Sequence, residues 1–198
     1  MKHIKEYNEY VDPFGEDDWD EVEPDRTFLT WLKIKYPDVS KWKDITSISC
    51  INQDLTDLIG IDKLINLREL YCYNNQLTNL NVTKNINLKQ LYCFNNQLRE
   101  LDVTKNINLL NLSCHHNRLS ELDVTKNINL EQLSFQYNQL TDLDLSNNIN
   151  LETLYCNSNQ LTELDVTNNI NLEELFCYNN QLPQLDLSNI IKLKYIRE

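Results

Sequence analysis

The chain has 198 residues and a formal net charge of −12 at pH 7, and this length is enough for one domain with a continuous core. The excess of acidic residues argues against a protein that binds DNA, RNA or anionic lipid through phosphate contacts, because that affinity comes from Lys and Arg displacing counterions. With two Gly and four Pro, the composition is also unlike that of a disordered or collagen-like chain.

The N-terminal stretch MKHIKEYNEYVDPF has no apolar region of the kind found in secretory signals. No part of the chain approaches the roughly 18 consecutive apolar residues of a membrane span. We therefore expect a cytoplasmic protein whose thiols stay reduced. Residues 1–24 are acidic, and the segment GEDDWDEVEPD (15–25) is predicted to be a solvated tail. Alternatively, it is an acidic peptide that occupies a basic partner.

Residues 25–44 are expected to form a helical N-terminal cap. The stretch DRTFLTWLKIKY places Asp25 or Thr27 just before a run of apolar residues, which is the pattern of a helix N-cap. The repeated coils that follow need such a cap, because the first coil has no neighbour on its outer side. Trp31 and Trp42 are predicted to pack in the cap rather than to bind a ligand.

From residue 67 the sequence repeats every 21 residues in the order L-x-x-L-x-C-x-x-N-x-L-x-x-L-[DN]-[VL]-[TS]-x-N-I-N. The repeats start at Leu67, Leu88, Leu109, Leu130, Leu151, Leu172 and Leu193, and a 22-residue copy precedes them from Ile45. A fixed period of this length with this motif is the signature of a leucine-rich repeat. We therefore predict that residues 45–198 form an α/β solenoid, a leucine-rich-repeat horseshoe of seven repeats plus a partial eighth. Short parallel strands would line its concave face, and mostly turns its convex face.

Residues 26–198 also resemble the bacterial leucine-rich repeats of internalin type. The copy DLTDLIGIDKLINLREL (54–70) is similar to the 22-residue internalin repeat. The later copies resemble a shorter cysteine-ladder variant, in which Cys replaces the second leucine of the strand. This resemblance implies a curved solenoid with a parallel sheet, which binds another protein through its concave face.

The repeated apolar positions are expected to point into the solenoid. In one coil they are Leu88, Leu91, Cys93, Leu98, Leu101, Val103 and Ile107. A repeated asparagine after the strand is expected to satisfy buried backbone N–H and C=O groups of adjacent turns. It stands at Asn75, Asn96, Asn117, Asn138, Asn159 and Asn180.

The six cysteines share one position of the repeat, namely Cys50, Cys72, Cys93, Cys114, Cys156 and Cys177. Phe135 takes this position in the remaining coil, which indicates a packing site rather than a reactive thiol. A zinc site in the stretch SCHHN is disfavoured, because strand alternation sends Cys114 inward and His115 outward. We therefore expect neither a metal nor a cofactor.

The strand residues that alternate with the inward Leu and Cys face the concave surface, and many are aromatic. They form two predicted clusters, Tyr71/Tyr73/Tyr92/Phe94 and Tyr155/Phe176/Tyr178, on either side of a polar centre of Ser113, His115, His116, Ser134, Gln136 and Tyr137. Ring pairs on neighbouring strands stabilise a sheet by about 0.2–1 kcal/mol each. A contiguous exposed aromatic surface also marks interaction sites, where Tyr and Trp dominate binding. We therefore predict that these rings and both histidines bind a partner protein.

A catalytic site is not predicted at this polar centre. His115 or His116 could serve as a base for Ser113 or Ser134, but no acidic residue is placed to orient the imidazole. The surrounding sequence also has no Gly-rich loop to provide an oxyanion site. We therefore expect the chain not to be an enzyme.

The eighth copy breaks off at KLKYIRE, with no amphipathic segment after it. Its charged residues Lys192, Lys194, Arg197 and Glu198 are expected to protect the edge of the sheet in a monomer, and pairing with a second copy is the alternative. The predicted function is thus protein binding through the concave face. The alternatives are an inhibitor or decoy that uses the acidic N-terminal segment against a nucleic-acid-binding partner, and a self-associating structural scaffold.

Overall fold

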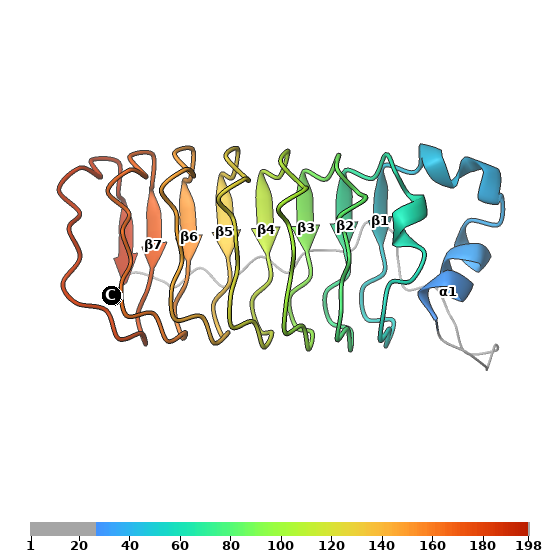
Figure 1. Cartoon of the computed structure of the whole chain (residues 1–198), viewed down its shortest axis with the longest axis horizontal. Helices are drawn as coiled ribbons and strands as arrows, with labels where there is room; N and C mark the ends of the chain where they lie inside the picture. Colours follow the sequence, from blue (N-terminus) through green and yellow to red (C-terminus); the bar gives the residue numbers. More distant parts are fainter. Residues whose placement is uncertain (1–26, 198) are drawn as a thin grey trace.

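A computed structural model describes residues 27–197, and Figure 1 shows their coils stacked side by side along the long axis. One parallel sheet of eight strands runs through the stack, with the strands in sequence order. The strands are Ser47–Ser49 (β1), Glu69–Tyr71 (β2), Gln90–Tyr92 (β3), Asn111–Ser113 (β4), Gln132–Ser134 (β5), Thr153–Tyr155 (β6), Glu174–Phe176 (β7) and Tyr195–Arg197 (β8). The predicted leucine-rich-repeat solenoid is therefore confirmed.

The register of the sheet follows the sequence repeat. Leu70 lies opposite Leu91, and Leu112 lies opposite Leu133, so each repeat position stacks on its copy in the next coil. The central leucine of each of these strands is buried, whereas the flanking strand residues alternate with it and face outward. Every repeat position therefore becomes a column of side chains that runs along the solenoid.

The N-terminal end is covered by two short helices. Helix α1 spans Phe28–Lys35, and the Oγ1 of Thr27 accepts a hydrogen bond from the backbone N–H of Thr30 at 3.3 Å, as expected for an N-cap. A 3-10 helix, η1 (Val39–Asp44), follows, and a second one, η2 (Ile61–Lys63), lies in the first coil. Among the described residues, no helix is long and apolar enough to cross a membrane.

Both tryptophans of the cap belong to the core, as predicted. Trp31 is 6% exposed and stacks on Phe28 with ring centroids 5.6 Å apart. Trp42 is 2% exposed, and its indole N–H donates to the carbonyl oxygen of Tyr36 at 2.7 Å. The acidic segment at residues 1–24, together with Asp25, the other candidate N-cap, lies outside the described residues.

The cysteines form a buried column in the solenoid, which confirms the predicted cysteine ladder. All six are free and buried. Phe135 occupies the same column and is also fully buried. Burial raises the pKa of the Cys114 thiol to about 12 and that of Cys93 well above its usual value. These side chains therefore act as small apolar residues of the core.

The predicted asparagine ladder after the strands is also present. The side-chain oxygen of Asn96 accepts from the backbone N–H of Leu77 at 2.9 Å. Its amide group donates to the carbonyl oxygens of Cys72 and Cys93, both at 3.0 Å. Each such asparagine thus ties two adjacent coils together, and its side-chain oxygen pairs a buried backbone N–H that would otherwise have no partner.

One predicted core position is wrong. Ile107 is 53% exposed, and the residue before it, Asn106, is fully buried. The amide group of Asn106 donates to the carbonyl oxygens of Val82 at 3.0 Å and Asn85 at 2.8 Å. The amide thus gives each carbonyl a second donor beside a backbone N–H, and the turn directs this amide inward and the isoleucine outward.

The same exchange recurs along the solenoid. Asn85, Asn106, Asn127, Asn148 and Asn169 form a second buried asparagine ladder. The isoleucine that follows each of them is 52–54% exposed, at Ile86, Ile107, Ile128, Ile149 and Ile170. Unlike the first ladder, these five asparagines have a buried side-chain oxygen without a hydrogen-bond partner.

Candidate functional site

The predicted binding residues lie at the carboxyl ends of strands β2 to β7, where they form three columns of side chains. The first column is the last residue of each strand and contains Tyr71, Tyr92, Ser113, Ser134, Tyr155 and Phe176. The second column follows the buried cysteine and contains Tyr73, Phe94, His115, Gln136, Asn157 and Tyr178. The third column comes one residue later and contains Asn74, Asn95, His116, Tyr137, Ser158 and Asn179.

Rings of the second and third columns form one continuous row. Tyr73 stacks on Phe94 with centroids 4.2 Å apart, and Phe94 stacks on His115 at 4.3 Å. His115 then meets His116 edge to face at 5.1 Å, and His116 lies 4.3 Å from Tyr137. We call these five residues the ring row. The two histidines therefore extend the first predicted cluster to Tyr137, inside the predicted polar centre.

The remaining predicted rings flank this row. Tyr71 and Tyr92 stack with centroids 5.2 Å apart, and the Tyr71 hydroxyl donates to the side-chain oxygen of Gln90 at 2.9 Å. In the other predicted cluster, Tyr155 and Phe176 meet edge to face at 5.0 Å. Tyr178 is held differently, because the guanidinium carbon of Arg197 lies 4.2 Å from its ring centroid.

The third column has an unusual backbone. Its residues have φ between 51° and 57°, in the left-handed region. Asparagine tolerates this region, whereas most other residues with a Cβ are destabilised there by about 1–2 kcal/mol. His116 and Tyr137 stand where neighbouring coils have Asn74 and Asn95. Tyr137 is also 47% exposed, so burial of its ring in the core does not offset the strain. In the sequence, only the asparagines of the third column indicate left-handed backbone, and this inference was not drawn from them.

The two histidines interact closely. Their Nδ1 atoms are 2.9 Å apart, so one nitrogen donates a proton and the other accepts it. The pKa of His115 is lowered to about 4, mainly because the imidazole is buried and to a smaller extent because of the charge of His116 beside it. Burial also lowers the pKa of His116. Both imidazoles are therefore neutral at pH 7, and the ring row presents an aromatic, weakly polar surface rather than a cationic one.

The geometry provides little for catalysis. The Ser134 hydroxyl donates to the side-chain oxygen of Gln136 at 3.0 Å instead of to a histidine. Ser113, the other serine considered as a nucleophile, is only 8% exposed. Across residues 27–197, no group of three or more His, Cys, Asp or Glu side chains is arranged to hold a metal ion.

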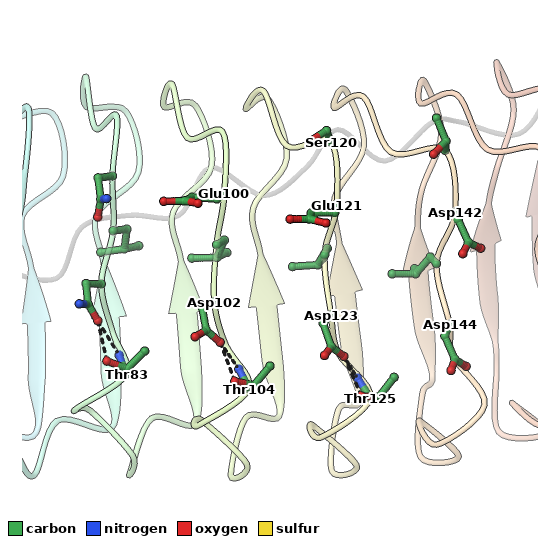
Figure 2. Close-up of a pocket in the computed structure, with 17 residues that line it drawn as sticks. Thr83, Glu100, Asp102, Thr104, Ser120, Glu121, Asp123, Thr125, Asp142 and Asp144 are labelled. Atoms are coloured by element: carbon green, nitrogen blue, oxygen red, sulfur yellow. Dashed lines mark hydrogen bonds between the residues drawn. The ribbon is translucent and has the colours of Figure 1, made fainter.

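A groove of about 990 Å³ lies on the segments that return from one strand to the next. Figure 2 shows its carboxylates in two rows across successive coils, with Glu100 and Glu121 in one row and Asp102 and Asp123 in the other. Asp102 accepts from the hydroxyl of Thr104 at 2.6 Å and from its backbone N–H at 2.9 Å, and these bonds lower its pKa. The aspartates thus form the turns of the repeat, which explains their regular placement.

Comparison with known proteins agrees with this architecture. Residues 128–169 match the family model described as leucine rich repeats (2 copies). Internalin C2 from Listeria monocytogenes is 24% identical with a TM-score of 0.60, over 80% of this chain and 83% of that one. A leucine-rich-repeat protein from Leptospira interrogans is 23% identical with a TM-score of 0.60, over 77% of this chain and 49% of that one. No protein of curated function matches in sequence.

A further solved structure is the functional domain of InlJ from Listeria monocytogenes, which includes a cysteine ladder. It is 30% identical with a TM-score of 0.44, over 80% of this chain and 49% of that one. The chain thus spans about half the length of the InlJ domain and of the Leptospira protein. Leucine-rich-repeat solenoids generally serve as scaffolds for protein–protein interaction. The described chain therefore has the leucine-rich-repeat fold, and its repeats resemble those of bacterial internalins.

Proposed function

We propose that the chain is a non-enzymatic recognition module that binds a partner protein through its concave sheet face, with the ring row at the centre of the contact. One observation carries this proposal: the rings of His116 and Tyr137 occupy left-handed positions at which the other coils of the column have a small polar residue, Asn74, Asn95, Ser158 or Asn179. Strained backbone persists where a function requires the side chain, and it clusters at binding sites. Building the sheet does not require rings at these positions, since asparagine or serine occupies them in the other coils.

The composition of the surface supports the same conclusion. The ring row offers neutral aromatic groups, with Tyr137 at the most exposed end. Polar side chains surround it, including Gln90 and Asn95. An aromatic centre with a polar rim is the usual composition of protein–protein interfaces, and Tyr is enriched among residues that dominate binding energy.

The test is affinity capture from a lysate with the wild-type chain and two matched double variants. In the first, Tyr92 and Phe94 are replaced by Ser on the concave face. In the second, Ile107 and Ile128 are replaced by Ser in the turns that precede β4 and β5, where both are about half exposed. We expect the second variant to retain a partner that the first loses. If both variants capture the same proteins as wild type, with circular dichroism showing both folded, the proposal is wrong.

The same experiment also distinguishes binding by the concave face from the alternative, in which the acidic N-terminal segment acts as a decoy. A chain that starts at residue 25 lacks the acidic segment but keeps the solenoid, so the proposed function requires it to bind normally. Loss of the partner in this truncation alone would assign binding to the acidic segment instead.

A further inference from the structure

The turns that lead into the strands carry an exposed apolar stripe. Figure 1 shows these turns lined up along one edge of the stack. Each turn exposes 51–54% of one isoleucine, namely Ile65, Ile86, Ile107, Ile128, Ile149 and Ile170. Because neighbouring coils lie about 4.8 Å apart, these side chains form a stripe roughly 24 Å long, which we call the isoleucine stripe. A continuous exposed apolar surface of this kind indicates a contact that covers it.

Hydrogen bonds between coils hold the isoleucine stripe in place. The side-chain amide of Asn108 donates to the carbonyl oxygen of Ile86 at 3.1 Å, and that of Asn129 donates to the carbonyl oxygen of Ile107 at 3.2 Å. Each isoleucine backbone is thus tied to the next turn. The stripe is therefore a preformed surface, which loses little conformational freedom when a partner covers it.

A column of charged residues runs beside the stripe, one residue before each strand. In coil order it reads Arg68, Lys89, Leu110, Glu131 and Glu152. The backbone N–H of each residue donates to the carbonyl oxygen of the one before it at 2.7–2.9 Å, so the five residues stack directly. The four charged side chains are exposed, and within the described residues none of them forms a salt bridge. This charge column is basic at one end, apolar in the middle and acidic at the other end.

We propose that a second copy of this chain covers the isoleucine stripe, antiparallel to the first and related to it by a two-fold axis beside Leu110. The order of the charge column carries this choice of occupant. Rotation about the axis places Lys89 opposite Glu131 of the second copy and Arg68 opposite Glu152, and the symmetry repeats both pairs. Leu110 faces its own copy. Opposite charges therefore meet on both sides of an apolar centre.

The same axis brings the two stripes together. Ile107 lies in the same turn as Leu110 and faces its own copy, while Ile86 faces Ile128 of the second copy. Burial of these side chains supplies the affinity, and the charge pairs beside them fix the register.

Other arrangements lose the charge match. A parallel dimer places basic coils against basic coils. Moving the axis by one coil brings either Lys89 or Glu131 against its own copy, and like charges that face each other are unfavourable. A shift of half a coil towards β5 sets Leu110 against Glu131. That shift also requires Glu173, which already binds Lys194 at 2.6 Å.

The other side of the stripe limits the extent of the contact. Lys84, Lys105 and Lys126 each stand two residues before an isoleucine, on the segment that returns from the preceding strand, and all three are exposed. Like charges would meet if the contact included them. The contact is therefore confined to the stripe and the charge column, with these lysines at its rim, where long side chains reach the solvent.

The dimer leaves the proposed binding face open. The ring row follows the strands, whereas the isoleucine stripe precedes them, so the two surfaces lie at opposite ends of the strands. A dimer thus presents two ring rows. Ile107→Ser and Ile128→Ser should weaken the dimer without changing the affinity of one ring row for its partner, so the dimer and the proposed function can fail independently.

Light scattering coupled to size exclusion tests the dimer in the full chain. We expect twice the 23.5 kDa of one chain. Glu131→Lys makes a lysine face Lys89, and this variant should be monomeric where wild type is dimeric. Adding Lys89→Glu restores opposite charges and should restore the dimer. Glu163→Lys makes the same change of charge at an exposed position outside the contact and serves as the control that stays dimeric.

Three results would overturn the proposal. They are a monomeric wild-type chain, a dimeric Glu131→Lys variant, and a double variant that stays monomeric although circular dichroism shows it folded.

Cysteine cross-linking tests the position of the axis. All six native cysteines are buried, so a cysteine placed in the stripe reacts selectively. Ile107→Cys faces its own copy, and we expect a short bismaleimide to give a covalent dimer. Ile128→Cys alone should cross-link poorly, whereas its mixture with Ile86→Cys should cross-link well. Equal cross-linking of the single variants at positions 107 and 128 would exclude this axis.

Discussion

Replacing an asparagine of each ladder by alanine should have unequal effects on stability. Asn117, in the first ladder, accepts from the N–H of Leu98 at 2.9 Å and donates to the carbonyl oxygens of Cys93 and Cys114 at 3.0 Å. Both carbonyls keep a second donor, Asn96 and Asn138 respectively. Asn117→Ala therefore loses two bonds of about 1 kcal/mol each and leaves one buried N–H unpaired at about 1–3 kcal/mol, for a total of about 3–5 kcal/mol.

Asn127, in the second ladder, is equally well buried but bonds differently. It donates to the carbonyl oxygens of Val103 at 3.0 Å and Asn106 at 2.9 Å. Both carbonyls also accept a backbone N–H, and the side-chain oxygen of Asn127 has no partner. Asn127→Ala thus loses about 2 kcal/mol of bonds but removes an unpaired oxygen that costs about 1–3 kcal/mol, so the net change is about 1 kcal/mol or less.

Urea unfolding followed by circular dichroism measures the comparison. The two substitutions remove the same atoms from similarly buried sites, so the cavity contributions are similar and the difference of about 3 kcal/mol reports the hydrogen bonding. We expect Asn117→Ala to unfold at clearly lower urea than Asn127→Ala. Equal midpoints, or a larger loss for Asn127→Ala, would refute the distinction between the two ladders.

Three further predictions follow from the core and the ring row. Cys93→Ser should destabilise the fold by about 1–3 kcal/mol, because it buries a hydroxyl in place of a thiol, and a thiol reagent should label native Cys93 only on unfolding. Because the folded pKa of His115 is about 4 against an ordinary 6.5, stability is unaffected above pH 6.5 and should fall by up to about 3 kcal/mol from pH 6.5 to 4 as the unfolded chain binds the proton. In the pH dependence of urea midpoints, His115→Gln should remove this part of the acid sensitivity. Tyr137→Asn should raise the melting temperature, because asparagine relieves about 1 kcal/mol of left-handed strain, and no change would show that the tyrosine is not strained.

The fold was predictable because the repeat fixes it. Every coil has the same length from residue 67 onwards, so leucine, cysteine and asparagine columns follow directly from the period. The cysteine ladder was also predictable, since Phe135 replaces Cys in one coil and therefore indicates a packing position. These inferences use information that is repeated many times in the chain.

The orientation of the N-I-N turn was not predictable from polarity. Hydrophobicity alone places Ile107 inside and Asn106 outside, whereas the Asn106 amide is buried against turn carbonyls of the preceding coil and the isoleucine is exposed. The columns of the ring row were identified correctly, but the step from His115 in the second column to His116 in the third depends on left-handed backbone, which joins the two columns. Hydrogen-bond demand and backbone conformation, rather than composition, decided both outcomes.

The most direct test of the proposed function is to measure partner affinity and melting temperature together for Tyr137→Asn. The wild-type chain and the variant Ile128→Ser serve as references, since Ile128 is 52% exposed and lies in the turn before β5, outside the ring row. A concave binding face predicts that Tyr137→Asn is more stable than wild type and yet binds the captured partner more weakly, while Ile128→Ser binds as wild type does. Unchanged affinity in a stabilised Tyr137→Asn variant would contradict a binding role for this end of the ring row.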